Sequence, residues 1–188
     1  MGPVTSLSER VRASLAAEAD RLRDARTGKE ALGPILELLL ATVEIQFEGE
    51  MLASILLLDA SGERLWHGAA PSLPQAYCTA IDGLNIGPGV GSCGTAAYLG
   101  HPVYVTDIAT DPLWAEFRDL AAAHGLRACW STPINGSDGG ILGTFAIYYR
   151  TPRSPTTDEL QAIRHVISSA AEAIERAGPQ DRPTQLSP

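Results

Sequence analysis

Apolar residues recur at spacings of three and four in three segments of the chain, which is the pattern of an amphipathic helix. These segments run from Thr5 to about Arg26, from Gly33 to Phe47 and from Thr156 to about Ala177. The last one opens with Thr-Thr-Asp-Glu, a capping box in which Thr156 is the N-cap and Glu159 the reciprocal partner. The pattern predicts two long helices at the start of the chain and one at its end.

Short apolar runs of strand length lie between these helices. They cover residues 52–58, 63–69, 84–86, 103–105, 128–134 and 141–149. Turn sequences at 59–62 and 135–140 join the first two and the last two runs, so each pair is predicted to form a hairpin. Short helices are predicted over 73–81, 93–99 and 112–124, because Ser72, Ser92 and Asp111 stand where an N-cap would.

This order of elements predicts an α+β fold with a central antiparallel sheet of about six strands. The terminal helices would cover one face of the sheet, and the short helices would form a pocket on the other. A chain of 188 residues is expected to hold one domain with accessory elements. We expect an N-terminal amphipathic helix over residues 1–31, the domain over 32–177 and a disordered, proline-containing tail over 178–188.

Charge and hydropathy exclude several classes of partner. The formal net charge of −8 disfavours nucleic acids and anionic membranes, which need clustered Lys and Arg. The most apolar run, Ile35–Ile45, contains two glutamates and is too short to span a bilayer, and the N-terminus lacks the layout of a signal peptide. Three cysteines, an odd number, indicate reduced thiols rather than a disulfide framework. We therefore expect a cytoplasmic protein.

A glycine-rich loop, Gly87–Gly91, precedes the predicted helix that begins near Ser92. The N-terminus of a helix presents free N–H groups and the positive end of the helix dipole, which favour an anion or a polar ligand. The loop lacks the Lys-Ser/Thr of a P-loop and the glycine spacing of a dinucleotide site. A ligand cradle and a purely structural turn both stay open on this pattern.

Residues 32–174 resemble a GAF domain, the small-molecule sensor module of bacterial signalling proteins and phosphodiesterases. The matching segments are Gly89–Ala97, Pro102–Ile108, Asp111–Trp114, Ala128–Ile134 and Gly143–Ile147. The resemblance implies the fold predicted above, with a ligand held between the sheet and the short helices.

Some ligands of similar domains do not fit this sequence. Cyclic-nucleotide GAF domains carry a lysine in the core of the domain, whereas Lys29, the sole lysine, precedes it. Bilin-binding GAF domains use a cysteine followed by histidine, and none of the three cysteines has that neighbour. The candidate haem ligands His67, His101, His124 and His165 show no paired ligand spacing. We expect no cofactor and no metal.

Two functions stay open. The first follows a resemblance to nitrate-sensing GAF receptors, in which Ala70–Pro74 would correspond to the anion-binding segment. The N–H groups of Leu73, Gln75 and Ala76 would bind a small anion, and apolar residues such as Val103 and Val105 would exclude water. The expected ligand-binding residues are Ser72, Leu73, Gln75, Ala76, Ser92, Cys93, Val103, Val105, Ile108, Trp114 and Trp130.

The second function follows a resemblance to free methionine-(R)-sulfoxide reductases. Cys93 matches one cysteine of that family, and a helix N-terminus would favour its thiolate. Cys78 and Cys129 are the other candidate catalytic thiols, although they depart from the family's spacing. Asp107 and Glu116 would be the carboxylates at hand for the substrate amine.

Of these two alternatives we favour the first, a sensor without catalytic residues. Its output would pass through a partner protein or a homodimer formed by the terminal helices, with Leu15 and Ile167 in the contact. Cys129 and Trp130 are neighbours on one strand and must face opposite sides of the sheet. The sequence leaves open which of the two faces the pocket.

Overall fold

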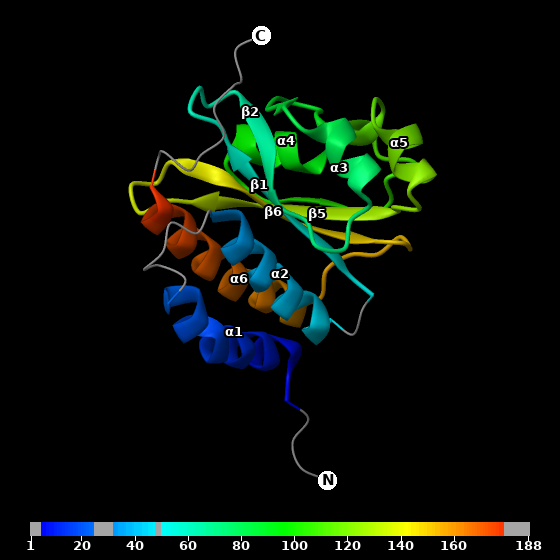
Figure 1. Cartoon of the computed structure of the whole chain (residues 1–188). Helices are drawn as coiled ribbons and strands as arrows, with labels where there is room; N and C mark the ends of the chain where they lie inside the picture. Colours follow the sequence, from blue (N-terminus) through cyan, green and yellow to red (C-terminus); the bar gives the residue numbers. More distant parts are fainter. Residues whose placement is uncertain (1–4, 25–31, 48–49, 179–188) are drawn as a thin grey trace.

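The structure, a computed structural model, describes residues 5–24, 32–47 and 50–178. It consists of three layers, with a sheet between two sets of helices (Figure 1). The long helices are α1 (Leu7–Asp24), α2 (Leu32–Gln46) and α6 (Thr157–Ala177). The short ones are α3 (Gln75–Ile81), α4 (Gly91–Leu99), the 3-10 helix η1 (Pro112–Trp114) and α5 (Arg118–Ala123). The predicted tail, residues 179–188, lies outside the described residues.

The sheet has six strands in the order β3-β2-β1-β6-β5-β4, and all neighbours are antiparallel. The strands are β1 (Leu52–Leu58), β2 (Arg64–Ala69), β3 (Leu84–Asn85), β4 (Val103–Val105), β5 (Ala128–Asn135) and β6 (Ile141–Tyr149). Both predicted hairpins, β1–β2 and β5–β6, are confirmed, and β6 pairs with β1 to join them.

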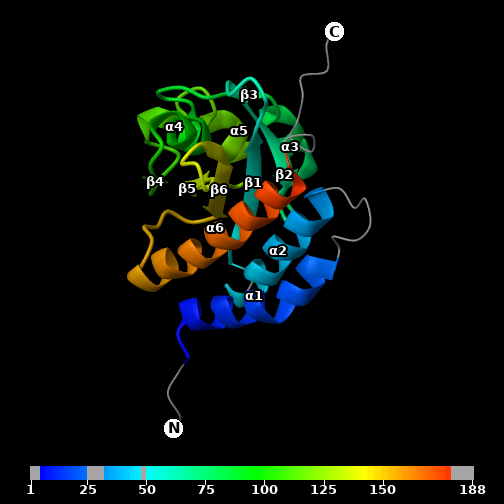
Figure 2. The same cartoon turned by 90° about the vertical axis from the view of Figure 1, so that its left-hand side faces the viewer.

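Each face of the sheet has its own hydrophobic core. Helices α1, α2 and α6 pack together on one face, and α3, α4 and α5 lie over the other (Figure 2). Alternating strand residues supply the two layers, so that Phe145 and Ile147 face the long helices while Ala146 and Tyr148 face the short ones. The predicted α+β architecture is confirmed. Among the helices of the described residues, none has the length and apolar character needed to cross a bilayer.

The long helices begin at well-defined caps. Thr156 and Glu159 form the predicted capping box at the start of α6. Asp158, one residue before Glu159, also accepts hydrogen bonds from the N–H groups of Leu7 and Ser8, at 2.8 and 3.0 Å. The carboxylate of Asp158 therefore caps α1 from a position about 150 residues away along the chain.

Two of the predicted caps of the short helices are wrong. Helix α3 begins at Gln75 after Pro74, and Ser72 instead donates its hydroxyl hydrogen to Glu44 of α2. Ser92 lies within α4 and makes no cap hydrogen bond, because its hydroxyl contacts the sheet and Trp114. Tertiary partners thus take both serine hydroxyls away from the local backbone.

The predicted helix over residues 112–124 is divided into η1 and α5. Asp111 does cap its start, since the carboxylate accepts a hydrogen bond from the N–H of Leu113 at 2.9 Å. The break follows Trp114, which is buried and donates its indole hydrogen to Ser92. The tight 3-10 turn therefore places the indole ring under α4.

Candidate functional site

Strand alternation decides which residues of β5 face the short helices. Cys129 belongs to the core layer beneath them, together with Tyr148 of β6. Trp130 belongs to the layer of the long helices, where its indole N–H donates to the carbonyl of Arg153 at 3.0 Å and its ring contacts Tyr149. Trp130 is therefore separated by the sheet from the other residues predicted to bind ligand.

Three buried hydroxyl groups lie on the same face of the sheet as Cys129. Ser54 of β1 and Ser131 of β5 both pair with Ala146 of β6, so they flank this small residue on either side. Thr144 stands two residues before Ala146 on β6. The exposed fraction of Ser54, Ser131 and Thr144 is 0%, and none of their hydroxyl oxygens has a hydrogen-bond partner.

An unpartnered buried polar group costs about 1–3 kcal/mol of stability. Three such groups on neighbouring strands are therefore an expensive feature for a core. Native proteins keep nearly all buried polar side chains hydrogen-bonded, so each departure needs an explanation such as a bound water, an ion or a reactive group. We define Ser54, Ser131 and Thr144 as the hydroxyl row.

Helix α4 covers this part of the sheet and adds a thiol. The sulfur of Cys93 lies 3.9 Å from the phenol oxygen of Tyr148. Ser92 donates its hydroxyl hydrogen to the carbonyl of Cys129 at 3.2 Å and accepts the indole N–H of Trp114 at 3.0 Å. These contacts fix the first turn of α4 against β5 and β6.

Gly94 permits this close packing. A Cβ atom at this position would lie 2.8 Å from the Cβ of Val90 and 3.0 Å from the carbonyl oxygen of Asn85. Only glycine lets the helix pack so tightly against the preceding loop. The glycine-rich segment is thus needed for structure, and it also places Cys93 over the sheet.

A small cavity of about 20 Å³ lies between α4, α3, η1 and the sheet. Its volume corresponds to the space of about one water molecule. Leu84, Val90 and Phe117 are partly exposed and lie on its outer side. The lining is completed by Tyr77, Ile81, Gly91, Ser92, Cys93, Trp114 and Tyr148.

The surroundings of Cys93 favour its thiolate. A hydrogen bond with Cys129 is the largest influence and lowers the pKa of Cys93, and the nearby hydroxyls of Ser131, Tyr148 and Thr144 lower it further, against the effect of burial. Burial raises the pKa of Cys129 and of Tyr148 well above their ordinary values. Cys93 is therefore the sulfur of the pair that deprotonates first.

The structure brings together Ser92, Cys93, Cys129 and Trp114 among the predicted site residues. Val105 and Ile108 are buried in the same core layer but do not line the cavity. Val103 is partly buried and packs against this core layer, also outside the cavity lining. Cys78 is buried on α3, where burial raises its pKa to about 11. Leu73 is buried in this layer as well, whereas Gln75 and Ala76 are exposed and lie outside the cavity.

The start of α3 is a poor environment for an anion. Glu44 accepts the hydroxyl of Ser72, and Glu37 accepts the N–H of Ala70, so two carboxylates lie beside this helix terminus. Negative charge at this position repels an anion. Helix α3 is also only seven residues long.

Sequence reasoning missed Tyr77, Tyr148 and the hydroxyl row. The available signal was a Ser or Thr within each of three apolar strands, at 54, 131 and 144, although Thr132 follows Ser131 directly. Alternation shows that such a residue departs from the pattern, but the facing layer is known only once the strands are paired.

No group of three metal-ligating side chains comes together within the described part of the chain.

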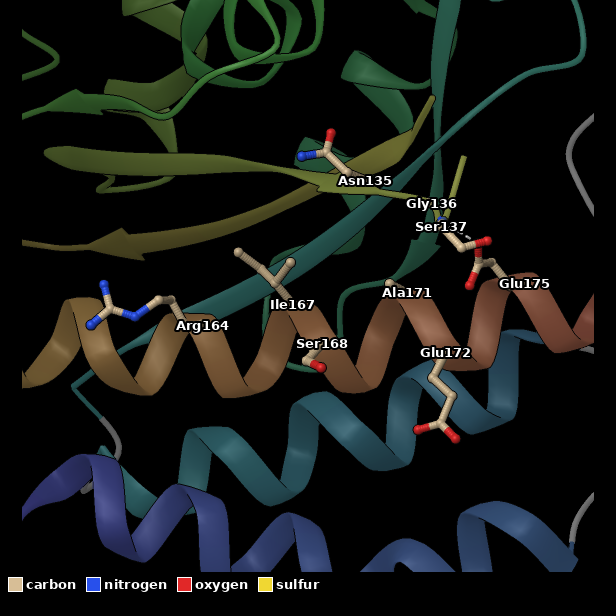
Figure 3. A pocket seen from close by; sticks show the side chains of 9 residues that line it. All are labelled: Asn135, Gly136, Ser137, Arg164, Ile167, Ser168, Ala171, Glu172 and Glu175. Carbon is tan, nitrogen blue, oxygen red and sulfur yellow. Dashed lines mark hydrogen bonds between the residues drawn. The ribbon is translucent and has the colours of Figure 1, made fainter. Parts of the chain in front are cut away.

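A second concave surface runs along the outside of α6, beside the β5–β6 turn (Figure 3). This groove has a volume of about 620 Å³. Arg164 lies towards one end, Glu172 and Glu175 towards the other, and Glu175 accepts the backbone N–H of Ser137. The remaining lining residues are Asn135, Gly136, Ile167, Ser168 and Ala171.

Comparisons with known proteins agree with this fold. A GAF domain model matches residues 32–175. The chain is 40% identical over 144 residues to the methyl sulfide methyltransferase-associated sensor of Methanosarcina acetivorans, which covers 77% of this chain but only 14% of that protein.

Solved structures of low sequence identity share the fold. Free methionine-R-sulfoxide reductase of Neisseria meningitidis, bound to its substrate, superposes with a TM-score of 0.67 at 17% identity, covering 91% of this chain and 89% of that one. The GAF domain of an Acinetobacter phosphoenolpyruvate-protein phosphotransferase gives a TM-score of 0.61 at 13% identity, covering 86% and 93%. With a family model spanning most of its length, the chain belongs to the GAF domain family.

Proposed function

We propose that this chain is a sensing domain that binds a small polar molecule in the cavity beneath α4. The family and the sensor named as a 40% identical relative support a sensing role. The observation that supports the location is the hydroxyl row, three buried donors without partners on the sheet face beneath α4. Two of them, Ser131 and Thr144, lie beside Cys93, which lines the cavity. A ligand with hydrogen-bond acceptors would satisfy these groups.

The size and chemistry of the cavity restrict the ligand. A volume of about 20 Å³ admits a molecule of very few atoms without rearrangement. The polar groups around it are hydroxyls, the thiol of Cys93 and an indole N–H, and its lining residues carry no Lys or Arg. A small oxyanion such as nitrate would be held by these neutral donors and by the dipole of α4, with Cys93 in its thiol form.

Thermal unfolding with nitrate, nitrite and free methionine sulfoxide tests this proposal. A ligand of the folded state, present at about 100 times its dissociation constant, adds roughly 2.7 kcal/mol of stability. We expect nitrate to give such a shift and the double variant Ser131→Ala, Thr144→Val to lose it. The variant itself should be at least as stable as the parent, because it removes two unpaired buried hydroxyls.

Thr79→Val, a similar change at an exposed position of α3, serves as the control and should keep the shift. A nitrate shift that survives in the double variant would place the site elsewhere. No shift with any member of the panel would remove the proposed ligand class.

We also propose that a second copy of this chain binds at the α6 groove. Ser168 lies midway between Arg164 and Glu172, four residues from each, on the exposed side of α6. In an antiparallel two-fold contact centred on Ser168, Arg164 of each copy would lie opposite Glu172 of the other. Glu172 also pairs with Arg176 of its own chain.

The sulfoxide reductase alternative has one observation in its favour, the presence of Cys93 and Cys129 in the same core layer beneath α4. Two others oppose it. Methionine sulfoxide is several times larger than the cavity, and Asp107, one of the carboxylates considered for its amine, is ion-paired with Arg127 at 3.1 Å. Structures below 25% identity support the shared fold alone.

A further inference from the structure

Two of the three cysteines, Cys93 and Cys129, belong to the same core layer beneath α4. Cys93 lines the cavity and lies 3.9 Å from the phenol of Tyr148, which pairs across the sheet with Cys129. The neighbouring Ser92 is hydrogen-bonded to the backbone of Cys129, so α4 is fixed directly above that residue. Cys93, Cys129 and Tyr148 thus lie together in the core layer beneath α4, and the hydroxyls of Ser131 and Thr144 lie beside Cys93.

We propose that Cys93 and Cys129 form a peroxide-reactive thiol pair, in which a small hydroperoxide oxidises Cys93 and Cys129 then closes a disulfide. This inference rests on the proposed cavity site and specifies a reactive ligand for it. A sensor domain with such a pair would respond to oxidant through a covalent bond between α4 and β5.

The chemistry balances with the groups present. The thiolate of Cys93 attacks one oxygen of the hydroperoxide, the O–O bond breaks, and the departing alkoxide or hydroxide takes up a proton to leave as alcohol or water. Cys93 is then a sulfenic acid. The sulfur of Cys129 attacks that of Cys93, the S–O bond breaks, and the hydroxide leaves as water with the thiol proton of Cys129. Two thiols lose two electrons, and one hydroperoxide is reduced.

The site geometry suits this oxidant for two reasons. The cavity holds a molecule about the size of water, which fits hydrogen peroxide much better than an amino-acid sulfoxide. The hydroxyls of Ser131 and Thr144 lie beside Cys93 and have no other partner, so they are free to donate to its attacking thiolate.

Cys78 provides a matched control within the same protein. Cys78 is buried to the same extent as Cys93, with 5% of each residue exposed, but it lies on α3 outside the cavity lining. Burial and the nearby carboxylate of Asp82 raise its pKa, so its thiolate is disfavoured. Burial alone would make the two thiols react alike, whereas the proposed site makes Cys93 react first.

The test is peptide mass spectrometry of the reduced full chain after a short exposure to hydrogen peroxide, with free thiols blocked before digestion and no reductant added. We expect a Cys93–Cys129 disulfide in the parent and in Cys78→Ser, and a sulfenic acid at Cys93, trapped by dimedone, in Cys129→Ser. The free thiol of Cys93 should disappear at least about tenfold faster than that of Cys78, because the thiolate is the reactive form of cysteine.

Because the key comparison uses the parent chain, it stands even where a cysteine variant fails to fold. Oxidation of Cys78 at the same rate as Cys93, or faster, would overturn the thiol pair. If nitrate stabilises the protein and both thiols stay reduced in peroxide, the thiol pair is wrong and the proposed function holds. If the disulfide forms and no panel member binds, the thiol pair holds and the proposed ligand class is wrong.

Discussion

At the residue scale, Gly143 shows how closely the central strands approach. A Cβ atom added at this position of β6 would lie 2.0 Å from the carbonyl oxygen of Leu56 on β1. That atom belongs to the backbone, so it cannot move aside without breaking the strand pairing. The pairing of the two hairpins thus depends on the absence of a side chain here.

We expect Gly143→Ala to lower the free energy of unfolding by more than about 3 kcal/mol, the range of severe overpacking. Gly33→Ala is the matched control, because its nearest contact is at 3.7 Å and it lies in α2. Alanine there should raise stability by up to about 1 kcal/mol. Urea denaturation of both variants checks the contrast, and equal effects would contradict the clash.

Glu44 makes stability depend on pH. Burial raises its pKa above the usual value, outweighing hydrogen bonds from Ser72 and Ala53. Between the ordinary and the raised pKa the folded state keeps a proton that the unfolded state has released, so stability falls as pH rises through this window. We expect Glu44→Gln to gain stability relative to the parent as pH rises from about 4 to about 7. Parallel pH profiles in thermal unfolding would show that Glu44 has no such role.

The residues of the site could be predicted only in part. Ser92, Cys93 and Trp114 stood out because glycine-rich loops and caps leave local signals. Trp130 was misplaced and Tyr148 missed, since the facing of a strand depends on which hairpins pair. The hydroxyl row becomes visible only when three strands lie side by side.

At the element scale, the caps of α6 and α1 meet. Thr156→Ala removes the acceptor for the N–H of Glu159 and should cost about 1 kcal/mol. Thr157→Ala, one residue further on and outside the Thr156–Glu159 capping box, is the comparison and should cost less. Thermal unfolding of the two variants measures this difference. Equal losses of stability would show that the Thr156 cap does not stabilise the protein.

Asp158→Ala should act on α1, although it lies at the start of α6. Its carboxylate accepts the N–H groups of Leu7 and Ser8, so its loss leaves both donors unpaired. We expect faster amide hydrogen exchange at Leu7 and Ser8 with little change in α6. Unchanged exchange in the first turn of α1 would contradict this long-range cap.

The elements themselves were largely predictable. Long helices and apolar strands carry periodic patterns that depend on burial of a whole face, so single contacts hardly alter them. The short helices follow different physics. Ser72 and Ser92 bind distant partners instead of their own helix, and Trp114 divides a segment that reads as one helix.

At the scale of the whole molecule, the packing of α1 changes the dimer hypothesis. Leu15 is only 5% exposed and packs in the core of its own chain, so it cannot serve a second copy without unfolding α1. The exposed face of α6, which holds the groove, is the surface that we propose instead, and the homodimer stays a prediction. We expect Ser168→Glu to weaken the dimer by placing two carboxylates at its centre.

Sedimentation at micromolar concentration checks this expectation. The parent should run with the mass of two chains, and Ser168→Glu with that of one. Gln161→Glu, an added charge at an exposed position of α6 outside the groove, is the control and should leave the dimer intact. A parent chain that sediments as a monomer would end the hypothesis.

The alternation of β5 and β6 has a consequence for signal transmission. Tyr148 lines the candidate cavity and Cys129 lies in the same core layer, while Trp130 and Tyr149, their immediate neighbours, contact Arg153 on the other face. Arg153 and Tyr149 in turn bind Glu159 of the α6 capping box, at 2.7 and 3.0 Å. A ligand or a disulfide that shifts these two strands therefore acts, through a single peptide bond in each, on the first turn of α6, and that turn also anchors α1. The candidate site and the first turn of α6 are therefore separated by the thickness of a single sheet.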